Sequence, residues 1–102
     1  MSTKIKNARS VLESLTGELS LGAALEAERL SLDLSLTKFS KILGISVQHL
    51  SDIEKGRRFV SPEKAAELAK KIGDSEALFV ELALQDSLAR SNLRFKVKVE
   101  AA

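Results

Sequence analysis

The sequence contains no cysteine, which excludes disulfide bonds, thiolate nucleophiles and every zinc site that uses sulfur ligands. Its single histidine, His49, has neither a cysteine nor a second histidine to complete a metal site or a nucleophilic pair. No apolar run approaches the roughly 18 to 20 residues that cross a membrane, and the first ten residues lead into no apolar signal-peptide core. No glycine-rich phosphate-binding loop is present. We therefore expect a cytoplasmic protein that is not an enzyme and has no metal, cofactor or membrane partner.

Size and charge set further limits on the protein. With 102 residues the chain is long enough for one domain with one modest core. Its 44% of hydrophobic and 29% of charged residues are ordinary for a globular protein and argue against wholesale disorder. The formal net charge of +2 is too small to indicate a nucleic-acid partner by itself, so the distribution of charge must carry that argument.

The single proline and the five glycines divide the chain into segments of helical length. Ser35, Ser46 and Ser61 stand where N-caps are expected, and Gly44 stands where a helix ends in the left-handed conformation. We expect Phe39, Ile42 and Leu43 to form one buried stripe, and Phe39, Ile42, Ile45, Leu50 and Ile53 to join two of the helices. Helices are expected over residues 5–15, 19–32, 36–43, 47–55, 62–72 and about 74–91.

Residues 93–100 have a different period from the rest of the chain. Apolar residues at 93, 95, 97 and 99 alternate with charged ones, which is typical of a strand with one buried face. Since no second strand pattern of similar length exists, the backbone of this strand lacks a partner in the same chain. A second copy of the chain is the expected partner, through Leu93, Phe95, Val97 and Val99. Another protein, such as a toxin, or the N-terminal segment is an alternative partner, and a disordered basic tail is the alternative to a strand.

The stretch 34–58 contains two short helices joined by a turn with a glycine, and the second helix exposes polar side chains. A helix fits the major groove of B-form DNA, where Gln48 can read adenine bidentately and Asp52 can accept a hydrogen bond from cytosine. The residues expected to contact DNA from this helix and its cap are Ser46, Val47, Gln48, His49, Ser51, Asp52 and Lys55.

The sequence "SKILGISVQHLSDIEKGRR" resembles the Xre-type helix-turn-helix regulators, which include lambdoid phage repressors and many antitoxins. The resemblance extends over roughly residues 20–73. It implies that the helix over 36–43 supports a recognition helix over 47–55, and that Arg29 forms a structural salt bridge with Glu54. Members of the family often begin the supporting helix with Thr-Gln, whose glutamine contacts phosphate. This chain has Ser-Leu there, although Lys38 lies nearby.

Charge is concentrated around this motif. Between residues 35 and 64 the basic side chains outnumber the acidic ones by six to three. Arg57 and Arg58 follow the recognition helix directly, where they can flank the groove and pair with phosphates. Each cation taken alone can equally be a solvated surface charge. The basic residues are Lys38, Lys41, Lys55, Arg57, Arg58 and Lys64, and the acidic ones are Asp52, Glu54 and Glu63.

These observations predict a mostly all-α protein. We expect a lambda-repressor-like helix-turn-helix domain of five to six helices, with a C-terminal β-strand that pairs between subunits. Residues 1–18 would form an N-terminal extension with a short helix, 19–73 the DNA-binding domain, and 74–102 a helix and the dimerising strand. The expected function is sequence-specific repression, as a homodimer on an inverted-repeat operator in double-stranded DNA and as an autoregulating antitoxin with a toxin partner. The alternatives are a phage-type repressor without a toxin, and a protein-interaction module that does not bind DNA.

Overall fold

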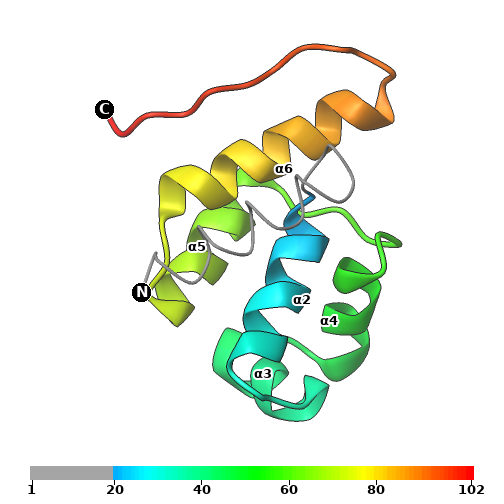
Figure 1. The fold of residues 1–102 in the computed structure, drawn as a ribbon, viewed down its shortest axis with the longest axis vertical. Helices are drawn as coiled ribbons and strands as arrows, with labels where there is room; N and C mark the ends of the chain where they lie inside the picture. Colours follow the sequence, from blue (N-terminus) through cyan, green and yellow to red (C-terminus); the bar gives the residue numbers. More distant parts are fainter. Residues whose placement is uncertain (1–19) are drawn as a thin grey trace.

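The computed structural model describes residues 20–102, so the helix expected over 5–15 lies outside the described residues. The regular elements of the described part are all helices. Helix α2 runs from α6 toward α3, and α4 lies beside α2 (Figure 1). No helix within residues 20–102 is long and apolar enough to cross a membrane. The helices are α2 (Leu21–Ser31), α3 (Leu36–Leu43), α4 (Val47–Glu54), α5 (Pro62–Ile72) and α6 (Glu76–Arg90).

A serine precedes each of these helices and caps it. In every case the serine hydroxyl accepts a hydrogen bond from the backbone N–H three residues later, which satisfies one of the amides that a helix start leaves without a partner. Gly44 ends α3 at a φ of 72°, a left-handed conformation that glycine adopts without steric cost. The capping serines are Ser20, Ser35, Ser46, Ser61 and Ser75.

All five helices contribute to one core. Phe39, Leu50, Leu68 and Phe79 are fully buried at its centre. The buried stripe expected on α3 is wrong at Ile42, whose side chain is 46% exposed. The buried residues of α3 are spaced as one helix face, and Ile42 lies about 100° around the helix from its neighbour in that face. The buried residues of α3 are Phe39, Ser40 and Leu43.

The segment after α6 is extended but belongs to no β-sheet within the described residues. The side-chain amide of Gln85 on α6 donates to the Phe95 carbonyl at 2.7 Å and accepts from the Val97 N–H at 2.9 Å. Glu81 accepts from the Val99 N–H at 3.2 Å. In the single chain, side chains of α6 and not a second backbone therefore bond to this edge, and pairing of the segment as a strand between subunits stays a prediction.

The apolar face of this segment is only partly covered by its own chain. Val97 and Val99 are half-buried, whereas the side chains of Leu93 and Phe95 are 46% and 65% exposed. Leu93 and Phe95 therefore form an exposed apolar surface within the part of the chain that the structure describes.

Candidate nucleic-acid interface

The turn between α3 and α4 fixes the direction of α4. The N–H of Ile45 donates to the Ser40 carbonyl at 3.1 Å, and the Ser46 hydroxyl accepts from the His49 N–H at 3.0 Å. Leu50 and Ile53 anchor α4 in the core. These contacts hold the first turn of α4 and its inner face, so they set the direction of the helix.

A close approach between backbones holds α4 against α2. A Cβ atom added at Gly22 would collide with the backbone carbonyl oxygen of Ile53. Only glycine allows this separation, because the atom in the way belongs to the backbone of α4 and cannot move by a side-chain rotation. Gly22 therefore sets the distance between α2 and α4, a constraint that the sequence pattern did not reveal.

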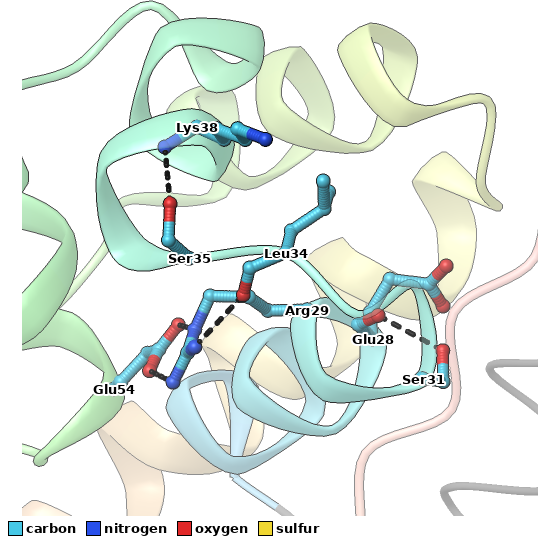
Figure 2. Close-up of polar contacts among 7 residues, drawn as sticks. All are labelled: Glu28, Arg29, Ser31, Leu34, Ser35, Lys38 and Glu54. Atoms are coloured by element: carbon cyan, nitrogen blue, oxygen red, sulfur yellow. Dashed lines mark hydrogen bonds and ion pairs between the residues drawn. The ribbon is translucent and has the colours of Figure 1, made fainter.

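Arg29 on α2 and Glu54 at the end of α4 form a bidentate ion pair (Figure 2). Arg29 Nε lies 2.9 Å from Glu54 Oε2, and Nη2 lies 3.0 Å from Oε1. Arg29 Nη1 also donates to the Leu34 carbonyl at 3.1 Å, which connects the loop before α3 to the pair. The two side chains are only 13% and 4% exposed, so the pair is a structural clamp and has little surface to offer DNA.

The outer side of α4 carries the residues that sequence reasoning assigned to base contacts. Val47, Gln48 and Lys55 are exposed, and His49 and Asp52 are half-buried. Ser51 is half-buried as well, and the capping residue Ser46 is exposed. By helix geometry Gln48, Ser51 and Asp52 lie opposite Leu50 and Ile53, whereas Val47 and His49 flank the buried side.

The loop after α4 turns back toward this surface. The N–H groups of Arg57 and Arg58 both donate to the backbone carbonyl of Asp52, at 2.8 and 3.2 Å. Gly56 has a φ of 75°, which permits the reversal. Both arginines are exposed, as is Lys38 on α3, so each can reach a phosphate.

Electrostatics places further cations beside α4. Partial burial, followed by the charges of Arg58 and Lys64, lowers the pKa of His49. The hydrogen bond from Arg57 lowers the pKa of Asp52, and the charge of Arg58 acts in the same direction. The charges of Arg57, Arg58 and Lys64 therefore act on His49 or Asp52, and the influence of Lys64, which belongs to α5, was not evident from the sequence.

Asp52 makes contacts that sequence reasoning missed. Its Oδ1 atom accepts from Gln48 Nε2 at 3.0 Å and from Arg57 Nε at 3.1 Å. The spacing of four residues between Gln48 and Asp52 is a signal for the first contact. The second depends on the path of the loop, for which the sequence offers no comparable signal.

The model of a helix-turn-helix family, HTH_3, matches residues 25–79, which is more than half of the chain. Among curated proteins and solved structures, none matches the chain. The matched stretch begins in α2, contains the whole of α3, α4 and α5, and ends in α6.

The chain belongs to this helix-turn-helix family, whose members are of the Xre and lambda-repressor type. It is accordingly a DNA-binding transcription regulator that acts on double-stranded DNA through a regulatory and not an enzymatic domain.

Proposed function

We propose that this protein is a cytoplasmic, homodimeric repressor that binds an inverted-repeat operator. The observation that carries the proposal is the outer side of α4, held rigidly by the Arg29–Glu54 pair and flanked by exposed cations. Gln48 offers the donor and acceptor needed to read adenine in the major groove. Arg57, Arg58 and Lys38 supply phosphate contacts, which position the helix. Occupation of the operator blocks transcription from it.

Binding can be tested with a labelled fragment of the DNA upstream of the reading frame. We expect the logarithm of affinity to fall linearly with log salt, with a slope of about 0.9 per phosphate contact and roughly 6 to 10 contacts per dimer. An unrelated duplex of equal length serves as the control and should bind more weakly. Absence of salt-dependent binding would favour the rival function, a module that binds only proteins.

The homodimer is supported by the geometry of residues 93–99. In an extended chain, alternate residues point their N–H and C=O groups to opposite edges. The backbone groups that bond to α6 belong to Phe95, Val97 and Val99. The backbone groups of the residues between them therefore point away from α6. These residues, Arg94, Lys96 and Lys98, are exposed. A second copy can pair with this outward edge around a two-fold axis. Such a dimer would place two α4 helices about 34 to 36 Å apart, one turn of DNA.

Deletion of residues 93–102, followed by light scattering, tests this dimer. We expect a folded monomer that binds the operator much more weakly. Two monomers would have to bind the two half-sites independently, without the gain that comes from linking them in a dimer. A truncated chain that stays a tight dimer would assign dimerisation to the helices. Circular dichroism before and after deletion controls for folding, since the core residues all precede this segment.

The proposal extends to an autoregulating antitoxin. The exposed apolar side chains of Leu93 and Phe95 lie beyond the matched domain and are not used by DNA binding, so they are available to a protein partner. Co-expression with a neighbouring reading frame tests this role. If the protein is an antitoxin, cells whose growth is arrested by the neighbouring product alone should grow again when this protein is co-expressed. If it is a phage-type repressor, co-expression should make no difference to growth.

A further inference from the structure

One carboxylate oxygen on α4 holds two of the residues assigned to DNA. Asp52 Oδ1 accepts from Gln48 Nε2 at 3.0 Å and from Arg57 Nε at 3.1 Å, and it forms an ion pair with Arg57, whose Nη2 atom lies 3.0 Å away. The Asp52 side chain is 22% exposed and that of Arg57 is 56% exposed. A candidate base reader and a candidate phosphate ligand are thus tied to the same atom before any DNA is present.

The contact with Asp52 determines which way the Gln48 amide faces. An ionised carboxylate can only accept hydrogen bonds, so the amide nitrogen must point toward Asp52 and the amide oxygen away from it. An aspartate with an ordinary pKa is ionised at neutral pH, and the hydrogen bond from Arg57 lowers the pKa of Asp52 further. The amide nitrogen has a second hydrogen, so Gln48 can still donate to adenine N7 and accept from adenine N6.

We propose that Asp52 is a positioning residue for sequence recognition, which fixes the polarity of the Gln48 amide and the place of the Arg57 guanidinium and reads no base itself. This inference rests on the proposed function. It gives Asp52 a role different from the cytosine contact expected from the sequence. A glutamine amide that is free to turn over offers donor and acceptor in either order, whereas a held amide offers them in one order only.

Arg57 keeps binding capacity while it is held. A guanidinium has five N–H groups, and the hydrogen bond to Asp52 uses only the one at Nε. The side chain of Arg57 is 56% exposed, so N–H groups at its Nη atoms can still reach a phosphate. Holding both side chains in advance also reduces the conformational entropy that is lost when the complex forms.

The experiment compares wild type, Asp52→Asn, Gln48→Ala and the double variant. Each protein selects from a duplex library with randomised positions, and sequencing of the bound fraction gives the base preference at every position. Asparagine has the shape of aspartate but presents either an oxygen or an amide nitrogen to Gln48, so the amide polarity is no longer fixed. Thermal unfolding confirms that each variant is folded.

We expect Asp52→Asn to reduce discrimination against the wrong base about 3- to 10-fold, at the same base pair that Gln48→Ala affects. This reduction is smaller than the full effect of losing a bidentate base contact. Affinity for random DNA should rise, because a negative charge is removed near phosphates. In the Gln48→Ala background, Asp52→Asn should change no base preference, since its effect passes through Gln48.

Three other outcomes would overturn this assignment or its basis. A loss of preference at a different base pair in Asp52→Asn would make Asp52 a direct reader. A uniform gain in affinity with unchanged preferences would make it a solvated charge. If the wild-type protein itself selects no sequence, the proposed function fails, and that result is distinct from the other two.

Discussion

Arg29 on α2 and Glu54 on α4 are joined by two parallel hydrogen bonds, although 25 residues separate them in the chain. The hydrogen bond to Glu54, as the largest influence, raises the pKa of Arg29. Because the third contact of Arg29 goes to the loop before α3, this one side chain ties together three parts of the DNA-binding unit.

Removal of either partner of this pair should destabilise the protein more than removal of both. Arg29→Met or Glu54→Leu leaves a nearly buried charge unpaired, which costs about 3–5 kcal/mol, whereas the double variant replaces both charges with apolar groups. Chemical denaturation of the four proteins measures the coupling. The pair Lys64–Glu67, whose side chains are 34% and 50% exposed, is the control, and its alanine variants should change stability by about 0.5 kcal/mol or less. Additive losses in the Arg29 and Glu54 cycle would contradict a buried pair.

Gly22→Ala should destabilise the fold even though alanine is the better helix former. The gain in helix propensity is at most about 1 kcal/mol. The clash with the Ile53 carbonyl forces α2 and α4 apart, and overpacking of this kind costs about 1–3 kcal/mol or more. Denaturant melts test the balance, with the exposed Glu26→Ala in the same helix as the control. A more stable Gly22→Ala variant would show that the two helices separate easily.

Arg58→Ala should weaken binding to all DNA sequences alike and lower the salt dependence. Each phosphate contact that is removed reduces the slope of log affinity against log salt by about 0.9. Anisotropy titrations at several salt concentrations give this slope for operator and random duplexes. Lys70→Ala removes an exposed cation of α5 outside the proposed interface and should leave the slope unchanged. An unaltered slope in Arg58→Ala would exclude a phosphate contact from that residue.

DNA binding should strengthen as the pH falls through the range in which His49 titrates. In the free protein its pKa lies below the ordinary value of 6.5, because of burial and the cations Arg58 and Lys64. Nearby phosphates favour the charged ring, so the pKa is higher in the complex and binding takes up a proton. Linkage then makes affinity rise below about pH 6.5. Titrations with wild type and His49→Gln check this, and identical pH profiles would place the ring away from phosphate.

Gln85→Ala should weaken the dimer by releasing residues 95 and 97 from α6. Two hydrogen bonds are lost per protomer, each with a net contribution of about 0.5–1.5 kcal/mol, and the extended segment is no longer ordered for pairing. The dimer of Gln85→Glu should be weaker than that of the wild type and stronger than that of Gln85→Ala. The glutamate still accepts a hydrogen bond from the Val97 N–H but cannot donate one to the Phe95 carbonyl. Analytical ultracentrifugation gives the dissociation constants. Ser87→Ala, an exposed change on α6, is the control. Equal constants for all four proteins would separate dimerisation from this segment.

The sequence by itself determined where the helices begin and end. Serine caps and left-handed glycines act within three or four residues, so α3 was predicted at its observed bounds and α4 to within one residue. The match of the family to residues 25–79 confirms the helix-turn-helix architecture that the motif over 34–58 indicated. The Arg29–Glu54 contact was expected only through the resemblance to that family, since spacing in the chain could not suggest it.

The tertiary structure decided which side chains meet. The exposure of Ile42 depends on which face of α3 the other helices cover, and the joint contacts of Asp52 depend on how the loop after α4 returns. The alternation over 93–100 indicated an extended chain but not its partner. The backbone N–H and C=O groups of such a segment can form hydrogen bonds with side chains as well as with another backbone. In the folded chain the Gln85 amide bonds to one edge of that segment through the Phe95 carbonyl and the Val97 N–H. Local patterns fix local conformation, whereas contacts between distant residues follow only from how the helices pack.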